Sequence, residues 1–295
     1  MSRRPSPTFP RTLTRLWSHT DPASETVRTS DALDRPTMHR RVTTDGGDYW
    51  VCSETGQLEH TVLIPPAPDA YDGHWREMVE RGEPTAKQKR SAKELLERFA
   101  PYRTHGRMFE IATGLGPVVE MARDLGWQPE GIEFSPFAAQ HTTDRTGIPV
   151  QVGPAEAMQL EENAYDLVIM DNLFEHLTQP RHVLHTAAKA LRPGGVIYLQ
   201  TLNAQCLSLH AQPLGWIYFA PGHQFVPTRL SFQHYLDHCG LEFVFRTTRG
   251  FRPRPQRDEH DINGVARSYE KIVSHLARAT HTGHRIECIL RRKAQ

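Results

Sequence analysis

The stretch RMFEIATGLG, residues 107–116, decides the fold, because it joins a short apolar strand to a glycine turn. The residues that follow, 116–125, have their apolar positions at helical spacing. Glycines at such a junction let the backbone approach a ligand closely, and the start of the helix offers N–H groups that have no partner. A Gly-x-Gly pair also fits a tight strand–helix turn that binds nothing. The neighbouring segments therefore decide between a ligand site and a plain turn.

Strands and single helices alternate around this turn. A helix is expected over 85–99, before it. After it, we expect strands over 131–134, 149–152, 166–170, 195–201, 241–247 and 285–291, and helices over 136–146, 180–191, 230–239 and 265–279. This alternation predicts an α/β fold with a doubly wound, mostly parallel, seven-stranded Rossmann-like sheet. The final helix–strand–strand order predicts one antiparallel strand in that sheet.

An N-terminal extension in two parts precedes the predicted sheet. Residues 1–45 are rich in Arg, Ser, Thr and Pro and predict a flexible leader. Four arginines and no acid in the first twenty residues weakly resemble an organelle transit peptide, but three prolines would interrupt its helix. Residues 46–84 predict a hairpin, with Thr55-Gly56 as its turn, and a helix. Residues 85–295 form the expected main domain.

Charge and cysteine content narrow the class of protein. The chain has 35 Lys+Arg and 34 Asp+Glu, and this formal net charge of +1 gives no electrostatic case for a nucleic-acid or membrane partner. No apolar run approaches the roughly 18 residues that a membrane span needs. The four cysteines are scattered without metal-ligand spacing, so we expect no metal and a cytoplasmic location. A homodimer is left open, because the sequence does not reveal the oligomeric state.

Three further features favour a ligand site over a plain turn. Glu133 ends the next expected strand, where an acidic side chain can accept hydrogen bonds from two ribose hydroxyls. A strongly apolar strand then runs into Asp171-Asn172-Leu173, at the carboxyl edge where such sheets bind ligands. Residues 191–195, LRPGG, are typical of a turn that ends a helix before the next strand.

In this order the segments resemble the class I S-adenosylmethionine (SAM)-dependent methyltransferases. They are most similar to the small-molecule branch that includes the ubiquinone-biosynthesis O-methyltransferases. MFEIATGLG resembles that family's first motif, GIEFSP its ribose-binding segment, DLVIMDNLFEHLTQP its fourth-strand motif, and LRPGGVIYLQT the motif before its fifth strand. The resemblance covers about residues 108 to 244 and implies SAM as the cofactor.

The resemblance also assigns residues to the cofactor. They lie in the first motif, after the second strand, in the adenine segment and after the fourth strand, and they are Glu110, Thr113, Gly114, Gly116, Glu133, Phe134, Ala155, Glu156, Asp171, Asn172 and Leu173. Three departures stand out, the first being that Glu110 replaces the aspartate of the first motif. Ala112 occupies the place of the motif's first glycine, and Pro154 that of an aspartate before the adenine segment. Ala112 is small, so the loop can still close.

Two histidines are the candidate catalytic residues. His176 follows Glu175 just past the fourth strand, and imidazole has the pKa range that a general base needs. His223 ends the aromatic segment 214–223, which resembles the family's substrate-facing lid. An equally weighted alternative is that His176 only packs or hydrogen-bonds at a helix start. In relatives the acid and the histidine can also hold a divalent ion, but Asn172 stands where a third carboxylate can occur, so we expect no metal.

The predicted function is therefore methyl transfer from SAM to a small-molecule acceptor, apolar or aromatic, through a hydroxyl group. N- or C-methylation and a non-catalytic SAM-fold scaffold remain the alternatives. A nicotinamide-binding protein is disfavoured because Val119 stands where the dinucleotide fingerprint needs a third glycine. A cluster of three arginines, Arg252, Arg254 and Arg257, fits either a site for a carboxylate or phosphate or a solvated loop.

Overall fold

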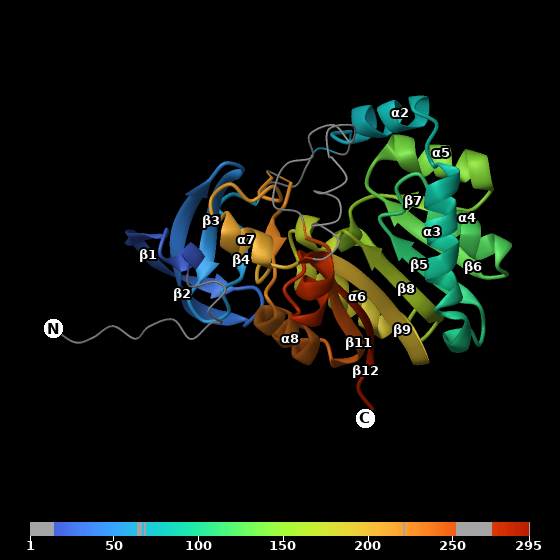
Figure 1. The fold of residues 1–295 in the computed structure, drawn as a ribbon. Coiled ribbons are helices and arrows are strands. Elements are labelled where there is room, and N and C mark those ends of the chain that lie inside the picture. Colours follow the sequence, from blue (N-terminus) through green and yellow to red (C-terminus); the bar gives the residue numbers. More distant parts are fainter. Residues whose placement is uncertain (1–14, 64–66, 68, 221, 252–272, 295) are drawn as a thin grey trace.

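A computed structural model describes residues 15–63, 67, 69–220, 222–251 and 273–294 (Figure 1). The arginine cluster at 252–257 and the first part of the helix expected over 265–279 lie outside the described residues. Residues 273–279, the end of that expected helix, are helical. No helix among the described residues is long and apolar enough to cross a membrane.

The central feature is a seven-stranded sheet with strand order β11-β12-β9-β8-β5-β6-β7. Its strands are β5 (Arg107–Ile111), β6 (Gln128–Glu133), β7 (Val150–Val152), β8 (Tyr165–Asp171), β9 (Leu191–Leu202), β11 (Leu241–Arg249) and β12 (Arg285–Arg292). Strand β12 runs antiparallel to both of its neighbours, and the pairs among β5, β6, β7, β8 and β9 are parallel. The predicted fold class, including its one antiparallel strand, is confirmed.

Different helices cover the two faces of this sheet (Figure 1). They are α3 (Ala86–Glu97), α4 (Pro117–Asp124), α5 (Pro136–Thr146), α6 (Pro180–Ala190) and α8 (Arg229–His238). Val168 of β8 lies in a core with residues of α6 and α8, whereas its neighbour Leu167 lies in a second core with residues of α3 and α4. Both side chains are fully buried. Strand β8 is therefore apolar at successive positions because it is covered on both sides.

Local signals set where these helices begin. Pro117, Pro136 and Pro180 occupy the first positions of α4, α5 and α6, where a helix needs no N–H donor. Thr85 and Gln88 form a capping box at the start of α3. The helix boundaries that the sequence predicts are accordingly close to those observed. The LRPGG segment differs, because β9 already begins at its first residue.

A second, five-stranded sheet forms most of the N-terminal extension, with order β1-β2-β3-β4-β10. Its strands are β1 (Asp21–Ser30), β2 (Arg35–Thr44), β3 (Gly47–Cys52), β4 (Leu58–His60) and β10 (Phe225–Val226). The hairpin predicted around Thr55-Gly56 is confirmed, since β3 and β4 pair antiparallel. The flexible leader expected over residues 1–45 is wrong for 21–44, which form β1 and β2. Its polar residues concealed an alternation in which Thr37 and His39 point into the protein.

The second sheet is tied to the main domain by β10, which comes after β9 in the chain and pairs with β4. A third core joins the two parts, and it contains both Tyr49 of β3 and the aromatic residues Trp216 and Phe219. Trp216 donates a 3.0 Å hydrogen bond to the Ser208 hydroxyl, and both Trp216 and Phe219 are buried. These two side chains therefore pack in a core, which is the alternative to the substrate-facing lid that the resemblance suggested.

Five further short elements are α2 (Asp72–Glu80), α7 (Leu207–Ala211), η1 (Ala100–Tyr102), η2 (Ala155–Ala157) and η3 (Phe174–His176). Helix α2 lies beside α5, away from the second sheet (Figure 1). Helix η3 directly follows β8 and lies at the carboxyl edge of the main sheet. These two elements and the glycine turn frame the candidate site.

Candidate active site

The turn between β5 and α4 has a left-handed backbone at three positions. Ala112 has φ 65°, Gly114 has φ 52° and Gly116 has φ 74°. The backbone N–H of Ala112 donates to the Ile132 carbonyl at 2.8 Å, which holds the turn against β6. A residue with a Cβ is strained in this conformation. The alanine that departs from the family motif thus keeps the loop shape that glycine adopts without cost.

Glu133 ties the glycine turn to the end of β6. Its carboxylate accepts a 2.8 Å hydrogen bond from the Gly114 N–H and a 3.0 Å hydrogen bond from the Ser135 N–H. Burial raises the pKa of this carboxyl group, and the backbone hydrogen bonds oppose that effect. Glu133 lies where the sequence placed it, at the carboxyl edge beside the turn. Carboxylate oxygens can accept more than one hydrogen bond each, so the group retains capacity for ribose hydroxyls.

Unpaired polar atoms gather at the same turn. Glu110 Oε2 and Thr113 Oγ1 are buried and have no hydrogen-bond partner among the described residues. Burial raises the pKa of Glu110 well above its usual value, and the nearby charges of Asp171 and Glu133 add to this. Buried polar atoms normally have partners. A ligand that offers a cation and hydrogen-bond donors would satisfy them, and SAM, with its ammonium, sulfonium and hydroxyl groups, fits that description.

The strand β8 supplies the next group of predicted residues. Asp171 accepts hydrogen bonds from the Gln200 amide at 2.6 Å and from the Asn172 amide at 3.0 Å. Burial raises the pKa of Asp171 to about 6, although the Gln200 hydrogen bond lowers it. Asn172 has φ 51°, a conformation that asparagine tolerates better than most residues, and Leu173 is buried beside it. These residues form the turn that leads into η3.

The remaining residues predicted for the cofactor, Phe134 after the second strand and Ala155 and Glu156 in the adenine segment, have different surroundings. Phe134 lies edge-on to Tyr71, with ring centroids 6.1 Å apart. Ala155 begins η2 and packs against the main core. Glu156 Oε1 accepts hydrogen bonds from the Thr178 N–H at 2.8 Å and the Thr178 hydroxyl at 3.0 Å. Glu156 thus anchors the segment before α6, and its assignment to adenine stays a prediction.

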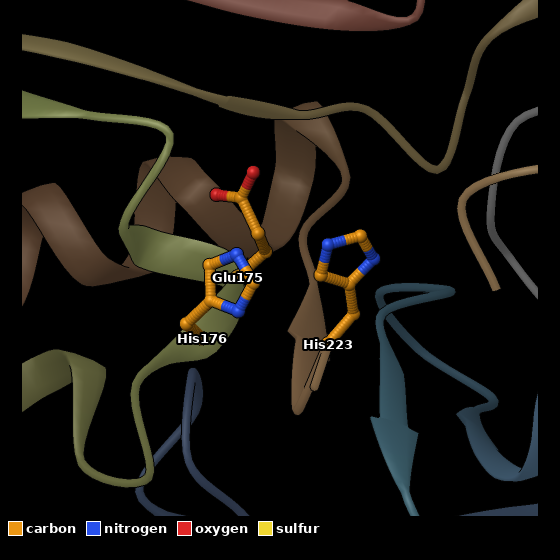
Figure 2. Close-up of side chains that lie close together, drawn as sticks. All are labelled: Glu175, His176 and His223. Atoms are coloured by element: carbon orange, nitrogen blue, oxygen red, sulfur yellow. The ribbon is translucent and has the colours of Figure 1, made fainter. Parts of the chain in front are cut away.

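The two candidate catalytic histidines come together although they are far apart in the chain. His176 contacts Gly222, which lies 46 positions further on, and His223 is the next residue. Figure 2 shows His176 and His223 beside Glu175, and the two ring centroids are 4.8 Å apart. Nδ1 of His176 lies 2.9 Å from the Gly222 carbonyl oxygen, and Nδ1 of His223 lies 2.6 Å from that of Tyr218. Carbonyl oxygens only accept, so each Nδ1 carries a hydrogen. In the neutral form of each imidazole, Nε2 is then the atom that carries the lone pair.

Glu175 completes this cluster from a buried position. The side chain is only 2% exposed, and its Oε2 atom accepts a 2.8 Å hydrogen bond from the Thr201 hydroxyl. Its backbone carbonyl accepts a 2.7 Å hydrogen bond from the Gln224 N–H, which holds the His223 segment next to η3. Burial and the neighbouring His176 lower the pKa of His223, so its neutral form is favoured. The cluster can accept a proton from a substrate.

The same three side chains also have a spacing that suits a cation. One ligand atom from each of Glu175, His176 and His223 lies within 4.8 Å of the others. Two imidazoles and a carboxylate are common ligands of zinc. The expectation of no metal stays a prediction, because a metal would occupy the same Nε2 atoms that a base needs.

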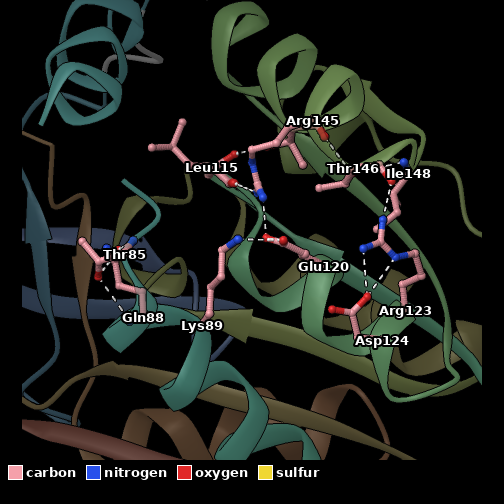
Figure 3. A network of polar contacts seen from close by, with 12 residues as sticks. Thr85, Gln88, Lys89, Leu115, Glu120, Arg123, Asp124, Arg145, Thr146 and Ile148 are labelled. Atoms are coloured by element: carbon pink, nitrogen blue, oxygen red, sulfur yellow. Dashed lines mark hydrogen bonds and ion pairs between the residues drawn. The ribbon is translucent and has the colours of Figure 1, made fainter. Parts of the chain in front are cut away.

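A network of charged side chains fixes the glycine turn from outside (Figure 3). Arg145 of α5 donates a 2.8 Å hydrogen bond to the Leu115 carbonyl and forms an ion pair with Glu120 of α4. Glu120 also pairs with Lys89 of α3 at 2.7 Å. The network thus joins three helices to the turn. It lies outside the set of residues that the sequence singled out, because its members are far apart in the chain.

The sequence also missed a group on α2. Trp75 lies over the turn, and a Cβ built on Gly114 would stand 3.0 Å from its ring. Asp72 accepts a hydrogen bond from the Ser135 hydroxyl at the start of α5. The only signal for these contacts is an aromatic and acidic run after a proline-rich stretch, and that pattern does not reveal where the helix docks.

Comparisons with known proteins identify the family of the chain. The methyltransferase domain family model matches residues 85–244, which is more than half of the chain. The ubiquinone biosynthesis O-methyltransferase of Burkholderia thailandensis is 28% identical over 176 residues, covering 53% of this chain and 75% of that protein. The enzyme of the same name from Caulobacter vibrioides is 32% identical over 115 residues, covering 37% and 45%. This chain thus matches only about half the length of several such relatives.

Solved structures show the same fold. A Haloferax volcanii protein solved in complex with the methyltransferase activator Trm112 has a TM-score of 0.53 at 17% identity, covering 77% of this chain and 96% of that one. A SAM-dependent methyltransferase from Archaeoglobus fulgidus has a TM-score of 0.51 at 17% identity, covering 69% and 94%. The family match, the doubly wound sheet and the glycine turn with Glu133 lead to one conclusion: this chain belongs to the methyltransferase domain family.

Proposed function

We propose that this protein transfers the methyl group of SAM to a hydroxyl group of a small-molecule acceptor. The observation that carries the proposal is the pair of neighbouring histidines, His176 and His223, each anchored through Nδ1 to a backbone carbonyl, at the carboxyl edge of the sheet that also presents Glu133 and the glycine turn. SAM supplies a methyl group on a positively charged sulfur that is ready for displacement. The protein's task is to hold the acceptor oxygen in line and to remove its proton.

The cofactor residues follow from the positions of the predicted side chains. Glu133 is the acceptor for ribose hydroxyls, because its carboxylate lies between the glycine turn and the start of α5. Glu110 and Thr113 have the unpaired buried atoms that face a ligand's polar end. Asp171 adds a third carboxylate nearby, and negative charge there favours a cationic cofactor.

The proton acceptor is His176, with His223 as its neighbour. Hydrogen bonds to backbone carbonyls orient both rings and leave each Nε2 with a lone pair. Buried Glu175 lies within 4.8 Å of both imidazoles and stabilises the cation that forms when one of them takes a proton. An imidazole base suits a hydroxyl better than an amine, which has its own lone pair. The histidine pair is thus the reason for preferring O-methylation.

The proposal also includes a class of acceptor, a cellular location and an oligomeric state. The acceptor that we propose is apolar or aromatic, and the similarity to proteins named ubiquinone biosynthesis O-methyltransferases supports this choice. All four cysteines are free and buried, which agrees with a cytoplasmic location. We leave a homodimer as an expectation to be tested by the mass of the protein in solution.

The first experiment is titration calorimetry with SAM. Micromolar binding to the wild type, weakened about tenfold or more in Glu133→Ala, would support the cofactor site; tenfold corresponds to about 1.4 kcal/mol. Glu130→Ala is the matched control, because this residue lies on the same strand and pairs with Arg107 instead. Absence of binding by the folded wild type would favour a non-catalytic scaffold.

An acceptor screen then tests the chemistry. Transfer of a labelled methyl group to phenols and catechols, compared with the matching anilines, separates O- from N-methylation. Methylation of the anilines alone would contradict the role of the histidine pair.

A further inference from the structure

Helix α2 is packed on the candidate cofactor residues rather than on the sheet that precedes it in the chain. None of its residues is buried. Its Trp75 ring lies against Gly114, and Asp72 accepts hydrogen bonds from the Ser135 hydroxyl and, at 3.4 Å, from the Phe137 N–H. Because α2 precedes residue 85, it lies outside the segment that matches the methyltransferase family model.

The six-membered ring of Trp75 makes this contact, and the same indole carries an unpaired donor. Its indole Nε1 is shielded from solvent and has no hydrogen-bond partner among the described residues. Glu110 Oε2 and Thr113 Oγ1, on the turn that Trp75 covers, share this property. A buried N–H without a partner is costly, because it has lost its hydrogen bonds to water without gaining others. Unpaired atoms of this kind on α2, near the end of β5 and on the glycine turn indicate a ligand that supplies both an acceptor and donors.

We infer that Trp75 is a cofactor-binding residue whose indole N–H donates to the carboxylate of the amino-acid end of SAM. The inference rests on the proposed function, because it needs SAM at the glycine turn. That end of the cofactor carries one ammonium and one carboxylate. Glu110 offers an acceptor for the ammonium, and Trp75 offers the donor for the carboxylate. Glu133 can then serve the ribose alone.

A second contact supports this position for α2. Tyr71, the residue before the helix, lies edge-on to Phe134. Burial raises the pKa of the Tyr71 hydroxyl, and the nearby charge of Glu133 raises it further. A Cβ built on Gly222 would lie 3.6 Å from the Tyr71 hydroxyl and 3.6 Å from His176 Nδ1. The start of α2 therefore reaches from the predicted ribose side to the histidine pair. Helix α2 thus forms the outer wall of the site.

The test compares two ligands in two variants. S-adenosylhomocysteine has the carboxylate, whereas methylthioadenosine has the same nucleoside and sulfur without the amino-acid end. Trp75→Phe keeps a ring over Gly114 but removes the donor. We expect this variant to bind S-adenosylhomocysteine about tenfold more weakly and methylthioadenosine as the wild type does, measured by calorimetry. Trp50→Phe, a change in β3 of the second sheet, is the matched control and should alter neither affinity.

The outcomes separate the inference from the proposed function. Unchanged affinity of Trp75→Phe for S-adenosylhomocysteine would overturn the role of Trp75 and leave methyl transfer standing. Equal weakening of both ligands would also overturn it, because the ring would then act only by packing. If the wild type bound neither ligand, the proposed function itself would fail. A thermal melt of each variant checks that the fold is intact, as expected for a change in a helix without buried residues.

Discussion

The rings of His176 and His223 lie 4.8 Å apart, and each donates its Nδ1 hydrogen to a backbone carbonyl. These hydrogen bonds fix the tautomer that each imidazole adopts when neutral. Nε2 is then the atom of each ring that can take a proton from a substrate.

If His176 is the base, His176→Gln should lower kcat by about a hundredfold or more without weakening SAM binding, because the missing step is proton removal. Steady-state kinetics and calorimetry on the same preparation check both halves. His182→Gln is the matched control, since this exposed histidine lies on the nearby α6. A loss of SAM affinity with unchanged kcat would contradict the assignment.

Asp171 predicts a pH dependence of cofactor choice. Burial raises its pKa to about 6, so the carboxyl is mostly neutral at pH 5.5 and ionised at pH 7.5. An ionised carboxylate favours the positive sulfur of SAM over the neutral sulfur of S-adenosylhomocysteine. The preference for SAM should therefore rise about threefold or more between these pH values by calorimetry. Asp171→Asn should remove that change, and a pH-independent preference in the wild type would argue against this effect.

Ala112 predicts a gain in stability. Its φ of 65° is left-handed, which costs an alanine about 1–2 kcal/mol, whereas glycine adopts it freely. After the extra freedom of glycine in the unfolded chain is subtracted, Ala112→Gly should raise the free energy of unfolding by about 0.5–1 kcal/mol. Urea denaturation measures this. The control Ala92→Gly, inside α3, should instead lose about 1 kcal/mol or more. Destabilisation by Ala112→Gly would show that the turn is not strained.

The histidine pair also predicts the response to metals. If Nε2 of His176 accepts the proton, turnover should survive EDTA, and added Zn²⁺ should inhibit it by binding between the histidines and Glu175, whose ligand atoms lie within 4.8 Å of one another. Activity assays with metal-free protein test this directly. Loss of activity in EDTA with recovery on adding a divalent ion would instead make these three side chains metal ligands.

Short-range patterns account for most of the main domain. Proline at the start of three helices, the capping box at Thr85 and the glycine turn are each decided by neighbouring residues, because capping and turn chemistry act within a few positions. The same holds for strand β8, whose continuous apolar run requires cover on both faces. These signals were sufficient to predict the sheet, the turn and Glu133 beside it.

Contacts between distant segments were decided only by the tertiary structure. Strand β10 pairs with β4 although more than 160 residues separate them in the chain. A strand of two residues has no sequence pattern from which this pairing could be predicted. The many polar residues of β1 and β2 concealed the second sheet. Whether such a half-buried segment forms a strand depends on the neighbouring strands and side chains that pack against it. The placement of Trp75 over Gly114 and of His223 beside His176 has the same origin. Local sequence determines where the chain turns and which side chains it offers, whereas packing over long distances determines which of them meet.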